Sequence, residues 1–172
     1  MDELEIKEME YRRYIDEHLF NVKLAFEQYK DPLCKALNIS VSSLGELIQR
    51  HDQSKFEDIE FDAYRNWFYP CDGEERDKDL FDEAWEHHYL NNPHHPQYWV
   101  RENYIEDMPP IYIAEMLIDW QAMKIKFGGN NYEYYLQERD KKPFSENTKK
   151  ILDVVVKEVF GELYHGESLS FN

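Results

Sequence analysis

The pair His51-Asp52 places an imidazole beside a carboxylate, a combination that suits a divalent metal ion. His51 follows Leu47 by four residues and Ile48 by three, so a helical period predicts that it points inward with them. Lys55 stands one helical turn further on, where its cation would meet a phosphoryl oxygen. The other interpretation of Lys55 is a helix-end cation that complements the helix dipole.

A second carboxylate stands inside the most apolar stretch of the chain. Asp119 lies between Ile118 and Trp120, and Glu115 precedes it by four residues, or about one helical turn. A buried carboxylate without a partner is costly, so Asp119 needs a cation or several donors. Few arginines stand in apolar surroundings, which favours a metal over a buried ion pair. Glu115 is expected near the same place, either as a direct ligand or behind a ligand.

Four of the seven histidines fall within one short window: His87, His88, His94 and His95. His88 shares a helical face with Ala84 and Trp85, whereas His87 leans toward the flank, so His88 is the favoured inward ligand. The helix break at residues 91–93 would let His94 or His95 turn back toward the same site. The sequence leaves open which of the two does so, and a solvated loop is the alternative for the whole window.

Apolar residues recur with a helical period along most of the chain, and no segment alternates as a strand does. The fold class is therefore predicted to be all-α. The absence of a repeat or linker predicts one domain over residues 1–172, with a core at about 11–160. The predicted helices are about 11–29, closed by Asp31-Pro32; a helix opened by a Ser43–Glu46 capping box and running toward Phe56; 80–88; about 111–127, apolar on most sides and hence central; 132–139; and 145–160, capped by Ser145.

Composition limits the partners. The net charge is −16, while 42% hydrophobic and 16% aromatic residues provide enough apolar surface for a packed core. Strong acidity argues against binding a nucleic-acid duplex or an anionic membrane. No apolar run is long enough to span a bilayer, and the acidic start does not resemble a signal peptide, so a cytoplasmic location is expected. Cys34 and Cys71 are far apart, which leaves histidines and carboxylates to hold any metal.

The order of these residues resembles the HD superfamily of metal-dependent phosphohydrolases, all-α proteins with an H…HD…D signature. Residues 51–55, HDQSK, are similar to the HDxGK element of the branch that hydrolyses cyclic dinucleotides, with Ser54 in place of the glycine. The segment NPHHP at residues 92–96 replaces the GYP element of that branch. The strings HDQSKF, AWEHHYLNNPHHPQYW and EMLIDW look closer still to a family of bacterial and phage proteins without an assigned activity, over about His18 to Phe127.

The resemblance implies a ligand set for one or two divalent ions: His18, His51, Asp52 and Asp119 for one, with Asp52 bridging to a second ion held by His88 and His94 or His95. Manganese, iron, zinc, nickel and magnesium all suit such ligands. The implied activity is hydrolysis of a small phosphorylated molecule, with nucleotides among the candidates, in which Asp52, Lys55 and Glu115 serve the reaction.

Four alternatives stay open from the sequence. The chain would also fit a non-catalytic acidic interaction protein that keeps a metal for structure, or a di-iron protein with oxygen chemistry. His18 could be an ordinary core histidine. Trp85, Trp99 and Trp120 are expected in the core, with stacking on a nucleobase as the other interpretation.

Overall fold

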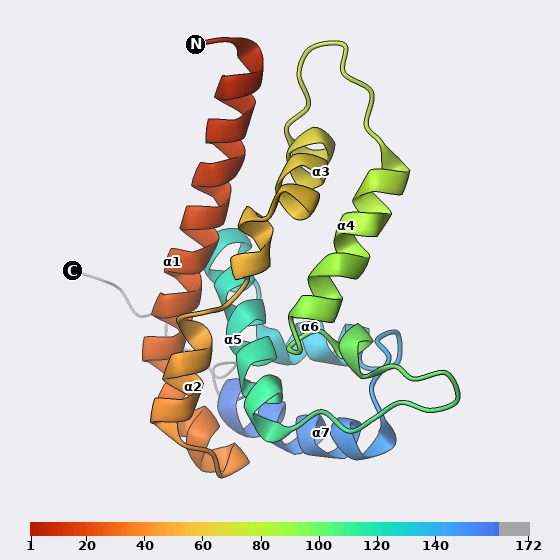
Figure 1. The fold of residues 1–172 in the computed structure, drawn as a ribbon. Helices are drawn as coiled ribbons and strands as arrows, with labels where there is room; N and C mark the ends of the chain where they lie inside the picture. The colour runs from red at the N-terminus through yellow and green to blue at the C-terminus, as the bar shows by residue number, and fades with distance from the viewer. Residues whose placement is uncertain (162–172) are drawn as a thin grey trace, which may run out of the picture.

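Two packed helices, α1 and α5, form the frame of the protein (Figure 1). The computed structural model describes residues 1–161, and residues 162–172 of the predicted domain lie outside the described part. The helices and 3₁₀ helices are α1 (Glu3–Leu37), α2 (Val41–Ile48), η1 (Gln53–Phe56), α3 (Asp58–Phe68), α4 (Lys78–Asn91), η2 (Pro96–Trp99), α5 (Pro110–Phe127), α6 (Asn131–Glu138) and α7 (Glu146–Phe160). Within residues 1–161 the β-type pairing is one isolated bridge, Val100 to Ile105. The predicted all-α class is confirmed.

The helix α1 is longer at both ends than the predicted 11–29. At its N-terminus the side chain of Asp2 accepts a hydrogen bond from the backbone of Glu5, whose side chain accepts one from Asp2 in return. At the other end, Pro32 does not close the helix, which continues to Leu37. A proline inside a helix costs about 3 kcal/mol, but burying Leu33 and Leu37 offsets this by about 1.5–3 kcal/mol each.

The predicted helix from Ser43 toward Phe56 is wrong in its start and its end. Ser40 is the N-cap and its hydroxyl accepts from the Ser43 backbone, so the Ser43–Glu46 spacing is not the cap. The helix α2 stops at Ile48, and the chain turns before η1. His51 and Asp52 therefore lie in a turn, not on a helix face.

The remaining predictions agree closely with the structure. The helices α4, α5, α6 and α7 begin and end within three residues of the predicted 80–88, 111–127, 132–139 and 145–160. The aromatic segment after residue 57, whose type was not predicted, forms α3, which packs against α4. Figure 1 shows these two helices side by side, joined by the long loop after α3.

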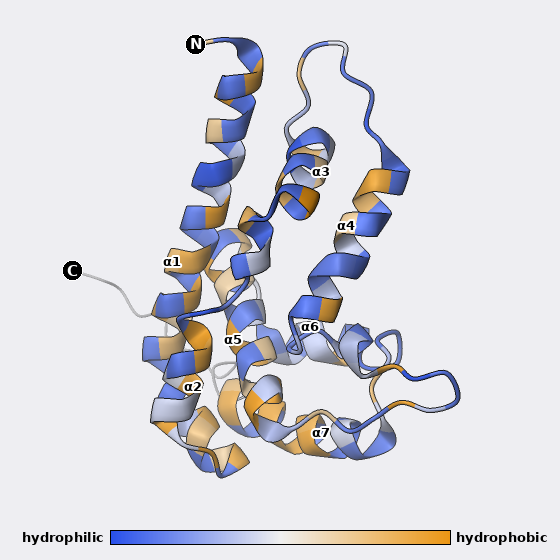
Figure 2. Ribbon diagram, in the orientation of Figure 1, coloured by the Kyte–Doolittle hydropathy of each residue, from blue (hydrophilic) through white to orange (hydrophobic). Residues whose placement is uncertain are grey.

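Two apolar clusters lie on either side of the middle of α1. The larger is built from α1, α2, α5, α6 and α7, with Leu117 and Ile118 at its centre, and the smaller from α1, α3 and α4, with Ile15 and Tyr64. Figure 2 marks hydrophobic positions along both α5 and α7. His18 stands on α1 between Ile15 and the next core residues, so the clusters surround it with apolar side chains.

None of the helices in the described part of the chain is both long and apolar enough to cross a bilayer.

Candidate metal centre

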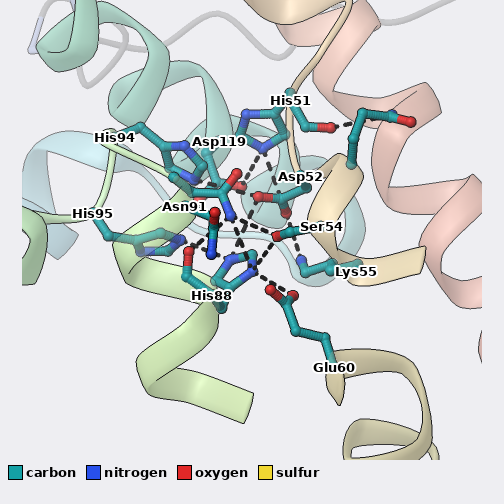
Figure 3. A network of polar contacts seen from close by, with 12 residues as sticks. His51, Asp52, Ser54, Lys55, Glu60, His88, Asn91, His94, His95 and Asp119 are labelled. Carbon is teal, nitrogen blue, oxygen red and sulfur yellow. Dashed lines mark hydrogen bonds and ion pairs between the residues drawn. The ribbon is translucent and has the colours of Figure 1, made fainter. Parts of the chain in front are cut away.

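All seven residues predicted as ligands converge on one largely buried cluster, and Figure 3 labels every one of them except His18. They come from four places in the chain: the middle of α1, the turn before η1, the end of α4 with the loop that follows, and α5. The members are His18, His51, Asp52, His88, His94, His95 and Asp119. Residues up to 101 positions apart in the sequence thus meet because α1 and α5 cross beside the α2–η1 turn.

The first group joins α1, the turn and α5. His18 Nε2 lies 3.3 Å from Asp52 Oδ2 and 3.2 Å from Asp119 Oδ1. His51 Nε2 lies 3.6 Å and 3.4 Å from the same two oxygens. Ligand atoms about 2.1 Å from a tetrahedral zinc ion stand about 3.4 Å apart, so these spacings are those of a coordination sphere. The structure thus brings His18 into the cluster, as the resemblance implied, and does not leave it among apolar side chains alone.

The second group uses the other oxygen of Asp52. His88 Nε2 and His94 Nε2 each lie 3.5 Å from Asp52 Oδ1. His95 Nε2 is 2.9 Å from His88 Nε2, so His95 belongs to this group together with His94. The sequence left open which of the two turns toward the site, and in the structure both do. Asp52 lies between the two groups with one oxygen facing each, the geometry of a bridging carboxylate (Figure 3).

The backbone of Asp52 explains how one residue reaches both groups. Its φ is 55° and its ψ is 23°, in the left-handed region that Asp and Asn enter more readily than most residues. This conformation ends the turn after α2 and directs the carboxylate inward. The prediction that His51 points inward is correct, although the helical period used to reach it does not apply in this turn.

Several of the buried atoms that form no hydrogen bond are atoms that a metal would use. His18 Nε2, His51 Nε2 and Asp52 Oδ1 are buried and form no hydrogen bond within the described structure, and the same holds for His94 Nε2. Buried polar atoms are nearly always satisfied, so a set of converging unsatisfied donors and acceptors calls for another partner. Neutral imidazoles and carboxylates are the ligands that first-row divalent ions bind, and the cluster could hold such an ion.

Glu115 lies behind two of the histidines. Its Oε1 is 2.9 Å from His51 Nδ1 and 3.5 Å from His94 Nδ1. A carboxylate there favours the tautomer with the proton on Nδ1, which leaves the Nε2 lone pair facing Asp52. Because the third metal-competent group is formed by these same three residues, a direct ligand role of Glu115 also fits the spacing.

Glu60 plays the equivalent part for α4, and the sequence did not reveal it. This fully buried residue of α3 accepts from His88 Nδ1 at 2.8 Å and from His87 Nδ1 at 2.7 Å. His87 therefore lies on the flank, as predicted, and reaches the cluster only through Glu60. The available signal was a glutamate on the same helical face as Tyr64, one turn before it.

Two neutral residues complete the support of His88. Asn92, interpreted from sequence only as part of a helix stop, is buried and donates to Ser54 Oγ at 2.7 Å and to the His88 carbonyl at 2.8 Å. The Ser54 hydroxyl thus accepts a hydrogen bond from Asn92, which a glycine at this position of an HDxGK element could not do.

The charges of the cluster reinforce one another. Burial alone would lower the pKa of His51, but Asp52, Asp119 and Glu115 outweigh it and raise that pKa to about 10. Burial opposes the charged forms of Asp52 and Asp119, yet the neighbouring histidines hold both pKa values well below the usual range. The carboxylates thus stay ionised and attract cations. Protons and metal ions compete for the same histidine nitrogens, so metal binding would release protons.

His95 behaves differently. Burial, followed by repulsion from His94 and His88, keeps its pKa well below the ordinary value. Its ring is therefore neutral, the form that binds metal.

Lys55 and Trp99 bear on two further expectations. The Lys55 ammonium lies 2.5 Å from Asp52 Oδ2, and Lys55 also stands in the last turn of η1, so it contacts the cluster and occupies a helix end as well. Trp99 is buried in the large core and donates to the Pro93 carbonyl, as the packing interpretation predicts.

Fold and site together define an all-helical protein whose buried histidine and carboxylate cluster could hold divalent metal. The chain belongs to a family described as a family of unknown function (DUF5662), whose model matches residues 7–158. The match therefore includes every residue of the cluster. No curated protein and no solved structure matches the chain.

Proposed function

We propose that this protein is a metal-dependent phosphohydrolase that acts on a small phosphorylated molecule. The observation that carries the proposal is the position of Asp52, one oxygen facing His18 and His51 and the other facing His88 and His94. A carboxylate shared in this way is suited to two ions at once, and paired ions are a common arrangement for phosphoester hydrolysis.

The HD resemblance supports the same conclusion. In this chain the order His18, His51-Asp52, Asp119 follows the H…HD…D signature, and these residues form one group in space. His88, His94 and His95 form the adjoining group, where the resemblance would put a second ion. Manganese, iron, zinc, nickel and magnesium remain the candidates, because the ligands are nitrogen and oxygen.

The residues of the cluster would have distinct roles in this reaction. Divalent ions bound in the cluster would supply Lewis acidity toward a phosphoryl group and toward water. Asp52 and Asp119 hold negative charge that retains those ions, and Glu115 keeps His51 and His94 facing inward. Lys55, beside Asp52, offers a cation to the charge that develops on phosphoryl oxygen.

A surface pocket gives substrates access to the cluster. His18, Asp52, Lys55, His88 and Asp119 all line it. Each of the two groups offers four protein ligands, which would close a tetrahedral site, whereas a six-coordinate ion such as magnesium or manganese would keep positions open toward the pocket. Such open positions would favour catalysis over the alternative of an acidic interaction protein with a structural metal.

The test is hydrolysis of phosphoesters by the full chain, loaded separately with each candidate metal. Phosphomonoesters are followed by phosphate release, and phosphodiesters and nucleotides by chromatographic separation of their products, with Asp119→Asn as the background. We expect metal-dependent hydrolysis above that background for at least one class. Stoichiometric metal binding with no hydrolysis of any class would overturn the proposal and favour the interaction protein.

A further inference from the structure

The pocket above the cluster has a volume of about 370 Å³, within the range of about 300–1,000 Å³ that small-molecule sites occupy. One side of it is polar and belongs to the cluster, through His18, Asp52, Lys55 and Asp119. An occupant that places one group against the cluster must place the rest of itself against the other walls.

Those other walls are aromatic. They are contributed by α1, α3, α4, α5 and α6, and six of their rings are Tyr11, Tyr14, Phe68, Trp85, Trp120 and Tyr134. The rings of Trp85 and His95 are nearly perpendicular, with centroids 5.1 Å apart, which joins the aromatic wall directly to the cluster. Flat rings bury large apolar areas and stack on such walls.

Few positively charged side chains line the pocket. Of the described residues that line the pocket, the lysines are Lys55 and Lys142, and no arginine is among them. Lys55 is already paired with Asp52, and Lys142 lies over the rings of Trp120 and Tyr134 at 5.9 Å and 5.8 Å. Metal in the cluster would hold one phosphate, but further phosphates of a polyphosphate chain would need more cations or bidentate arginines, which the described residues lining this pocket do not supply.

We infer that the pocket takes a phosphate ester with a single phosphate and a flat aromatic body, the phosphate against the cluster and the ring between the aromatic walls. This inference rests on the proposed function, because it assumes that metal in the cluster receives the phosphate. It adds a preference for the body of the molecule that the cluster alone does not give.

Binding of non-hydrolysable phosphonates to the metal-loaded full chain tests the inference without an activity assay. Isothermal titration compares phenylphosphonate, methylphosphonate and methylenediphosphonate. We expect phenylphosphonate to bind at least tenfold more tightly than either of the others.

Phe68→Ala probes the wall itself. Phe68 is 57% exposed at the pocket, and Phe20 is 60% exposed on α1 outside it, so Phe20→Ala is a matched control that should fold equally well. We expect Phe68→Ala to weaken phenylphosphonate threefold to tenfold and to leave methylphosphonate unchanged. Phe20→Ala should change neither.

The outcomes separate the two proposals. Equal affinity for phenylphosphonate and methylphosphonate, or no effect of Phe68→Ala, would overturn the aromatic preference and leave the proposed function standing. Tighter binding of methylenediphosphonate would overturn the single-phosphate preference. Failure of all three to bind the metal-loaded protein would overturn the proposed function, and this inference with it.

Discussion

Replacing Glu115 with glutamine keeps the side-chain volume but removes the charge that faces two histidines. Glu115 Oε1 now lies 2.9 Å from His51 Nδ1 and 3.5 Å from His94 Nδ1. Both contacts use the same oxygen, so a glutamine can place its amide oxygen there, but this neutral oxygen is a weaker acceptor than a carboxylate. We expect both histidines to lose the charged acceptor that favours the tautomer with Nε2 free.

The size of the effect follows from the loss of one such partner. Removing an outer carboxylate that orients a ligating histidine lowers metal affinity about 10- to 100-fold, or about 1.4–2.8 kcal/mol. Isothermal titration of the metal-free full chain with manganese and with zinc measures it directly. Glu158→Gln, the same chemical change at an exposed position of α7, is the control and should bind as the wild type does.

Two results would refute the reasoning. Affinity of Glu115→Gln within twofold of the wild type would show that Glu115 does not orient the histidines. Loss of binding as complete as in Asp119→Asn would show that Glu115 is itself a ligand, in the group it forms with His51 and His94.

Three other changes test separate parts of the structure. Lys55→Met should keep metal occupancy and lower kcat/KM on a phosphate ester about 10²- to 10³-fold, and unchanged turnover would contradict its role. Glu74, which forms a bidentate pair with Arg65, has its pKa lowered to about 2 by that guanidinium, so Glu74→Gln should cost about 1 kcal/mol at pH 7 in urea unfolding. Because the folded pKa is lowered, this difference should shrink as pH falls through about 4.5 toward 2; an equal difference at pH 7 and pH 4 would be inconsistent with it. Leu117→Ala, at a fully buried position of α5, should lower the free energy of unfolding by about 2–5 kcal/mol, and a loss below 1 kcal/mol would contradict the assigned core.

The sequence predicted the long, strongly periodic elements well. The helix α5 was found because its apolar residues cover most sides and Gly128 ends it, and α7 because Ser145 caps an amphipathic run. These signals are local, and the tertiary structure does not override them.

Helix boundaries that depend on tertiary packing could not be predicted from the sequence. Pro32 predicts a helix end, but burial of Leu33 and Leu37 in the core carries α1 past it. Ser40 and Ser43 both offer a capping hydroxyl, and only the path of the chain after α1 decides between them.

Part of the site could likewise be predicted from the sequence and part could not. Residue types alone singled out His51, Asp52 and Asp119, because unpartnered polar groups in apolar surroundings need a reason. Glu60 and Asn92 were missed as supporting residues, because helical spacing shows at most which face Glu60 occupies and does not show its contact with His88 or that of Asn92 with Ser54.

The most direct test of the metal centre is elemental analysis of the protein purified without chelator, beside Asp52→Asn and Asp16→Asn. Asparagine tolerates the left-handed backbone of residue 52 and matches its volume, so the variant removes charge with little change of shape. Asp16 is exposed on α1 and serves as the control. We predict one or two equivalents of a divalent metal in the wild type and in Asp16→Asn, and loss of that metal in Asp52→Asn. Full occupancy in Asp52→Asn, or no metal in the wild type even after incubation with manganese, iron, nickel and zinc, would contradict the assignment of this cluster as a metal centre.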